Sequence, residues 1–173
     1  IFGHGTQVAF VAAGGLHALG EKAGVSPGAS LMNIKVINDD GIGTDEGIIL
    51  GIDRVCDLAE EARRKGFYPT DELYPNVLNI SFGGEDDGDP DNPVRVACRQ
   101  ASQEYGLDVI AAAGNFGPKM TTITLPACDP EVIAVGAVET LGELVIWDKS
   151  SRGPTKQGET KPDFVMWGTN LEM

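Results

Sequence analysis

The spacing of apolar residues along the chain predicts three helices. The first begins near His4 and ends at Gly14, because small and apolar residues recur there at helical spacing. The second begins after Thr44, a residue type that caps helices, and ends before Gly66. Its predicted inward stripe consists of Ile48, Ile49, Ile52, Val55, Cys56 and Ala59. The third runs over residues 93–105, with Asn92 and Pro93 at its start.

Short apolar runs rich in β-branched residues predict the strands. The pattern is clear in four runs and weaker in two more. The clear runs are Leu31–Ile37, Val77–Ser81, Asp108–Ala113 and Val132–Val138, and the weaker ones are Leu144–Ile146 and Asp163–Met166. Strands that alternate with helices favour a parallel sheet covered by helices on both faces. We therefore expect an α/β fold of three layers with a mostly parallel central sheet, in one domain over residues 1–173.

Composition narrows the possible partners. The 173 residues are 42% hydrophobic and 23% charged, as in soluble globular proteins, and the formal net charge is −13. A negative field repels phosphate backbones and anionic lipid head groups, and no apolar run is long enough to cross a bilayer. We therefore expect neither nucleic acid nor a membrane as a partner. The three cysteines lack metal-ligand spacing, and we expect Cys56, Cys98 and Cys128 to be small buried residues.

Glycine and small polar residues follow three of the predicted strands. They lie at Gly41–Gly43, at Gly83-Gly84 and at Gly114-Asn115. Ligands and catalytic groups of α/β proteins gather where the strands of the sheet end, because the loops converge there. We therefore expect the functional site at these three turns.

Two side chains carry candidate chemistry. His4, at the start of a predicted helix, suits a general base that turns one ring nitrogen to a nucleophile and the other to a carboxylate. Taken alone, a surface or capping histidine is the favoured interpretation, and only the motif context makes it a candidate base. Asn115 suits a donor to a developing oxyanion, although Gly114 and Asn115 also fit a simple turn after a strand. His17 has no such context and is predicted to be a loop residue.

Several motifs in order resemble the subtilases, the subtilisin-like serine proteases, over nearly the whole chain. The order of the motifs is more specific than any one of them. They are His4-Gly5-Thr6, Gly24–Val36, Asn79–Gly84 (NISFGG), Ala111–Asn115 (AAAGN), Pro126–Val138, and Ser150–Pro154 with Lys161-Pro162-Asp163 and Gly168-Thr169. The chain is similar to the central part of the catalytic domain of that family.

The resemblance implies a serine endopeptidase that cleaves peptide bonds through an acyl-enzyme and needs no cofactor. It assigns His4 as the general base and Asn115 to the oxyanion hole. The substrate peptide would lie between Gly41, Ile42 and Gly43 on one side and Ser81, Phe82 and Gly83 on the other, while Ala112, Ala113 and Gly114 would line the specificity pocket. The partner is then a peptide or protein. The residues include no signal peptide, and the compartment stays open, although the resemblance is compatible with export.

The family's aspartate precedes the histidine motif and its serine follows the Gly-Thr segment, and neither matches a residue of this chain. We expect little or no protease activity from the chain alone. Gln7, Phe10, Lys149 and the pair Met166-Trp167 depart from the family pattern. These departures leave open a pseudoprotease or peptide-binding module that keeps the groove without catalysis.

The acidic loop at residues 85–92 is the only candidate for a structural calcium site, and no motif supports it. A calcium ion needs six to eight converging oxygens, so a solvated acidic turn is the favoured interpretation.

Overall fold

The computed structural model describes residues 3–15, 23–68, 71, 74–140 and 144–169. They form two compact units, one made by the described residues up to Gly51 and the other by residues 52–170. Helix α2 (Asp45–Arg64) begins in the first unit and ends in the second.

The first unit contains α1 (His4–Ala13), which confirms the first predicted helix. Gly3 precedes it with a φ of 84°, and the Gly14 N–H closes its last turn on the Phe10 carbonyl. Residues 24–26 lie against the last turn of α1, where the Val25 N–H donates to the Val11 carbonyl at 2.9 Å.

The apolar run Leu31–Ile37 is not a strand, and its prediction as a buried strand was wrong. Leu31 and Met32 are 59% and 56% exposed. An extended segment becomes part of a sheet only when a neighbour pairs with its backbone, and no described strand pairs with this run. The chain turns directly after this run, where the Gly41 N–H donates to the Asn38 carbonyl at 3.1 Å.

Helix α2 confirms the second predicted helix in its caps and its apolar stripe. The Thr44 hydroxyl accepts a hydrogen bond from the Gly47 N–H at 3.1 Å, as an N-cap does. Gly66 follows the last turn with a φ of 85°, a conformation that glycine adopts without strain. Within the stripe, Ile52, Val55, Cys56 and Ala59 are buried, and Ile48 and Ile49 are half-buried.

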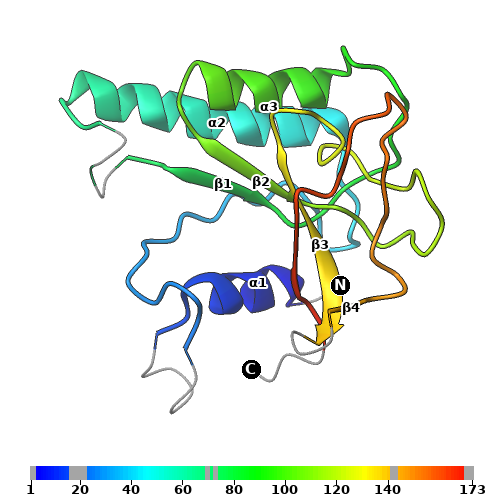
Figure 1. The fold of residues 1–173 in the computed structure, drawn as a ribbon. Coiled ribbons are helices and arrows are strands. Elements are labelled where there is room, and N and C mark those ends of the chain that lie inside the picture. The colour runs from blue at the N-terminus through cyan, green and yellow to red at the C-terminus, as the bar shows by residue number, and fades with distance from the viewer. Residues whose placement is uncertain (1–2, 16–22, 69–70, 72–73, 141–143, 170–173) are drawn as a thin grey trace. The chain divides into compact units, whose positions relative to one another are not determined.

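The second unit holds a mostly parallel sheet, as predicted. Its strands are β1 (Val77–Ile80), β2 (Asp108–Ala112), β3 (Ile133–Thr140), β4 (Val145–Ile146) and β5 (Phe164–Trp167). β1, β2 and β3 are parallel neighbours, β5 is parallel to β3, and only β4 runs antiparallel to β3. Figure 1 shows the first three side by side. The predicted α/β fold class is confirmed.

Helix α3 (Pro93–Gln103) covers one face of this sheet beside the C-terminal part of α2 (Figure 1). The Asn92 side chain caps it by accepting a hydrogen bond from the Val94 N–H at 2.9 Å. The helix ends two residues earlier than predicted, and Gly106 follows with a φ of 70°. The core between helix and sheet consists of Val94, Ala97, Cys98, Ala101, Leu107, Val109, Ala111 and Ala134. Its apolar burial is the main stabilising term of the unit.

The three cysteines are buried and unpaired, as predicted. Burial raises the pKa of Cys98 and of Cys128 to about 12 and that of Cys56 to about 11. Because the thiolate is the reactive form, we expect native protein to react with a disulfide reagent at pH 8 at least about tenfold more slowly than denatured protein. Ellman's assay in buffer and in guanidinium measures both rates. A thiol that reacts as fast in the native protein would contradict the buried assignment.

Candidate active site

The loop after β2 carries the candidate oxyanion donor. Its first residue, Ala113, still belongs to the sheet, because its N–H donates to the Val135 carbonyl of β3 at 2.9 Å. The chain then turns at Gly114, and Asn115 lies exposed one residue further. Within residues 52–170, no described group pairs with the Asn115 carboxamide, so its N–H groups are available to a ligand.

Gly114 is a position where only glycine fits. Its φ of 113° is strained for any other residue, and a Cβ there would lie 2.4 Å from Thr124 Cγ2 and 2.7 Å from Ser151 Oγ. The loop therefore packs directly against two other segments, around Thr124 and around Ser151.

Three hydrogen bonds hold this loop against the segment 149–151. The Ser151 N–H donates to the Gly114 carbonyl at 3.0 Å, and the Gly117 N–H donates to the Lys149 carbonyl at 2.9 Å. The Ser151 hydroxyl accepts the third from the Phe116 N–H at 3.1 Å. The backbone on both sides of Asn115 is thus fixed, while its side chain has no partner among the described residues of this unit.

The structure brings the predicted substrate segment Ser81, Phe82 and Gly83 close to this loop. The segment follows β1, and Gly84 forms an antiparallel bridge with Leu125. A Cβ on Gly83 would lie 2.5 Å from the Leu125 carbonyl oxygen and 2.9 Å from Thr124 Oγ1. The same Thr124 hydroxyl donates to the Ala113 carbonyl at 3.1 Å. Thr124 therefore links the candidate substrate edge to the candidate oxyanion loop.

Sequence reasoning missed Thr124 and Ser151 as members of the site. Both are buried hydroxyl residues, 3% and 1% exposed, and both touch the glycine turn. The sequence offers only a weak signal, namely a polar Thr121–Thr124 stretch and the pair Ser150-Ser151, because contacts across separate loops leave no periodic pattern.

His4 and the predicted edge Gly41, Ile42 and Gly43 belong to the first unit. His4 is the exposed first residue of α1. The Asn38 N–H donates to the Ile42 carbonyl at 2.9 Å, and the Ile42 side chain is 63% exposed, as suits a surface edge. Asn115 and Ser81–Gly83 lie in the second unit, so a cleft shared by all of them stays a prediction. His17 lies outside the described residues.

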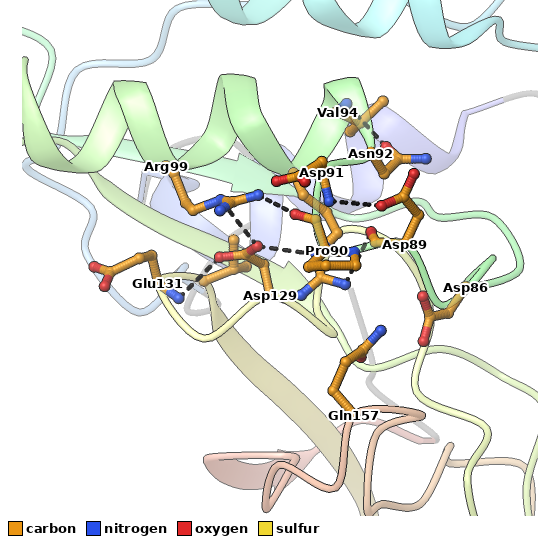
Figure 2. Close-up of polar contacts among 12 residues, drawn as sticks. Asp86, Asp89, Pro90, Asp91, Asn92, Val94, Arg99, Asp129, Glu131 and Gln157 are labelled. Atoms are coloured by element: carbon orange, nitrogen blue, oxygen red, sulfur yellow. Dashed lines mark hydrogen bonds and ion pairs between the residues drawn. The ribbon is translucent and has the colours of Figure 1, made fainter.

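Three carboxylates of the acidic loop accept hydrogen bonds from the loop's own N–H groups, and Figure 2 shows the bond from the Asp91 N–H to Asp89. Asp86 accepts from Gly88, and Asp89 accepts from Asp91, each at 2.9 Å. Asp87 accepts from the Asn92 side chain and from the Asp89 N–H, and these two bonds lower the pKa of its carboxyl group. In the part of the chain that the structure describes, no three His, Cys, Asp or Glu residues are placed to hold a metal ion. The absence of a cofactor stays a prediction.

A buried ion pair lies behind the acidic loop. Asp129 is fully buried and Arg95 is 2% exposed, and Arg95 Nε donates to Asp129 Oδ2 at 3.0 Å. Burial alone would lower the pKa of Arg95, but the hydrogen bond to Asp129 and neighbouring charges raise it, so Arg95 stays charged. Arg95 also donates to the Asp89 carbonyl, and Arg99 forms a second ion pair with Asp129 at 3.3 Å (Figure 2). The cluster joins α3 and the acidic loop to the turn that precedes β3.

The Lys161-Pro162-Asp163 motif fixes β5 against β3. The buried Lys161 ammonium group donates to the Val132 carbonyl at 2.6 Å and to Asp163 Oδ2 at 2.7 Å. The same carboxylate oxygen accepts from the Ala134 N–H at 2.7 Å. The motif has a structural role in this unit.

The structure bears on one part of the membrane prediction, namely whether a helix could span a bilayer. None of the helices among the described residues has the length and apolar character that a bilayer span requires.

The chain belongs to the subtilase family, whose family model matches residues 2–173. It is 33% identical over 178 residues to the serine protease AprX of Bacillus subtilis (strain 168), in an alignment that covers 98% of this chain and 38% of AprX. It is 37% identical over 143 residues to subtilisin DY of Bacillus licheniformis, with 80% of this chain and 44% of that protein covered. The recognition made from the ordered motifs is confirmed.

The fold is shared with solved subtilase structures. Sphericase superposes with a TM-score of 0.72 at 27% sequence identity, covering 93% of this chain and 51% of that one. The S41 psychrophilic protease superposes with a TM-score of 0.67 at 28% identity. The chain spans about half or less of the length of each of these four relatives.

Proposed function

We propose that this chain is the central part of a subtilisin-like serine endopeptidase. The whole enzyme hydrolyses peptide bonds of peptides or proteins through an acyl-enzyme and requires no cofactor. The observation that supports this most is the loop at Ala113–Phe116. Hydrogen bonds to the segment 149–151 hold it on both sides of Asn115, and Gly114 packs against Thr124, which also lies against Gly83. Among the described residues of this unit, the Asn115 carboxamide has no partner.

Each proposed residue has a chemical task. His4 takes the proton of the serine nucleophile and later gives it to the leaving amine. Asn115 donates a hydrogen bond to the oxygen that becomes negative as the carbonyl carbon turns tetrahedral. The serine and the aspartate that complete the triad match no residue among these 173, so we propose that the chain alone does not cleave peptides.

The substrate is proposed to bind as an extended strand. Gly41, Ile42 and Gly43 would flank it on one side and Ser81, Phe82 and Gly83 on the other, because backbone without side chains permits close approach of a second backbone. Ala112, Ala113 and Gly114 would form a pocket wall of small residues. Such a wall leaves room for a sizeable apolar side chain before the scissile bond.

The proposal is tested with a fluorophosphonate probe, which labels only an activated serine nucleophile. We expect the full-length protein to be labelled, labelling to be lost when His4 is replaced by alanine, and the 173-residue chain to remain unlabelled. Folded full-length protein that is not labelled but retains a peptide would instead identify a binding module without catalysis. Labelling that persists in His4→Ala would remove His4 from its assigned role.

A further inference from the structure

We infer that Ser151 positions the Asn115 carboxamide by fixing the two peptide planes on either side of the Asn115 Cα atom. The inference rests on the proposed function, because it assigns a second residue to the same oxyanion site. Ser151 does not touch the reacting atoms in this assignment and acts only through Asn115.

Ser151 makes one hydrogen bond to each peptide that flanks Asn115. Its N–H donates at 3.0 Å to the Gly114 carbonyl, which belongs to the peptide before Asn115. Its hydroxyl oxygen accepts at 3.1 Å from the Phe116 N–H, which belongs to the peptide after it. Peptide units are planar, so the two dihedral angles of Asn115 are the only soft rotations between them. Fixing both planes therefore sets the direction in which the Asn115 side chain leaves the backbone.

Ser151 is itself held firmly in place. It is 1% exposed and packs against Gly114, where a Cβ would come within 2.7 Å of its hydroxyl oxygen. Its neighbour Ser150 is 2% exposed, and the Ser150 hydroxyl accepts from the Ala137 N–H of β3 at 3.0 Å. The Ser150 hydroxyl therefore contacts β3 and makes no bond to the loop that carries Asn115.

The need for such support follows from the exposure of Asn115. Its side chain has no partner among the described residues of its unit, so its orientation depends on its backbone. A donor in an oxyanion hole must lie about 2.7–3.1 Å from the developing charge. A displacement of about 1 Å is enough to cost a large part of the rate, up to about 10²-fold.

The first test compares two buried serines in the full-length protein. Ser151→Ala removes the acceptor of the Phe116 N–H, and we expect kcat per labelled active site to fall about 10- to 100-fold with little change in KM. Ser150→Ala is the matched control, since it also removes a buried hydroxyl that accepts one backbone N–H, but from β3. We expect its kcat per active site to stay within about twofold of the wild type. If Ser151→Ala does not fold, Ser151→Cys keeps the shape with a weaker acceptor and should lower kcat in the same direction.

A double variant separates positioning from general destabilisation. If Ser151 acts only through Asn115, adding Ser151→Ala to Asn115→Ala should lower kcat by less than about twofold more. Losses that multiply in the double variant would show that Ser151 acts elsewhere, and the inference would be overturned.

Amide hydrogen exchange gives a readout that does not depend on catalysis. We expect the Phe116 N–H to exchange at least about tenfold faster in Ser151→Ala and at the wild-type rate in Ser150→Ala, because only the first loses the bond that protects this amide. An unlabelled wild type would reject the proposed function and the inference with it. A labelled wild type with wild-type kcat in Ser151→Ala would reject the inference alone.

Discussion

Replacing Asn115 by alanine is expected to lower kcat of the full-length enzyme by about 10²- to 10³-fold, with KM little changed. The substitution removes a donor that acts on the charge of the transition state and hardly on the neutral substrate. The magnitude is the one established for a single oxyanion donor in a subtilisin, and we carry it over to this chain. Initial rates on a chromogenic peptide, normalised to active sites titrated with a fluorophosphonate, measure it.

The control for this prediction is Asn33→Ala, which removes another exposed asparagine from a segment outside the proposed site. We expect its kcat and KM to match those of the wild type. Equal activity of Asn115→Ala and the wild type would show that the carboxamide does not stabilise the oxyanion. A rise in KM alone would instead place Asn115 in ground-state binding.

Replacing Asp129 by alanine is expected to lower the free energy of unfolding by about 3–5 kcal/mol. Asp129 is fully buried, and its side chain pairs with the buried Arg95 at 3.0 Å. The variant leaves the Arg95 guanidinium group buried without its counter-ion, and it also leaves the Glu131 N–H without the oxygen that accepts from it at 3.0 Å. Urea denaturation followed by circular dichroism gives the change in midpoint and slope.

Two comparisons show whether the loss comes from the uncompensated charge. Asp91→Ala removes an exposed carboxylate from the neighbouring acidic loop, and we expect a change within about 0.5 kcal/mol. The double variant Arg95→Met with Asp129→Leu replaces the pair by apolar groups of similar size and should recover a large part of the loss. If Asp129→Ala costs less than about 1 kcal/mol, the pair is not the structural link that its burial indicates.

The sequence predicted best those elements whose signals are local. The caps of α2 and α3 follow from Thr44 and Asn92, because a short polar side chain satisfies N–H groups only two or three residues away. The short strands β4 and β5 were also found, from apolar runs of a few residues. The prediction of a strand at Leu31–Ile37 failed for the opposite reason, since a strand depends on a partner strand whose place in the sequence follows no local rule.

The same distinction applies to the candidate site. The order of the motifs alone led to the subtilase family. Glycine turns and the AAAGN segment can be recognised in the sequence because each is set by the backbone conformation of a few consecutive residues. Asn115 and the segment Ser81–Gly83 could therefore be named from the sequence.

Only the tertiary structure revealed what holds these residues. Thr124 joins the two candidate segments, Ser151 fixes the peptides around Asn115, and Arg95 pairs with Asp129 across 34 positions of sequence. Each contact depends on the close approach of segments that fold together from distant parts of the chain. Contacts of this kind leave no regular pattern in the sequence. Helices, caps and turns do leave a local pattern, because their hydrogen bonds close within a few residues.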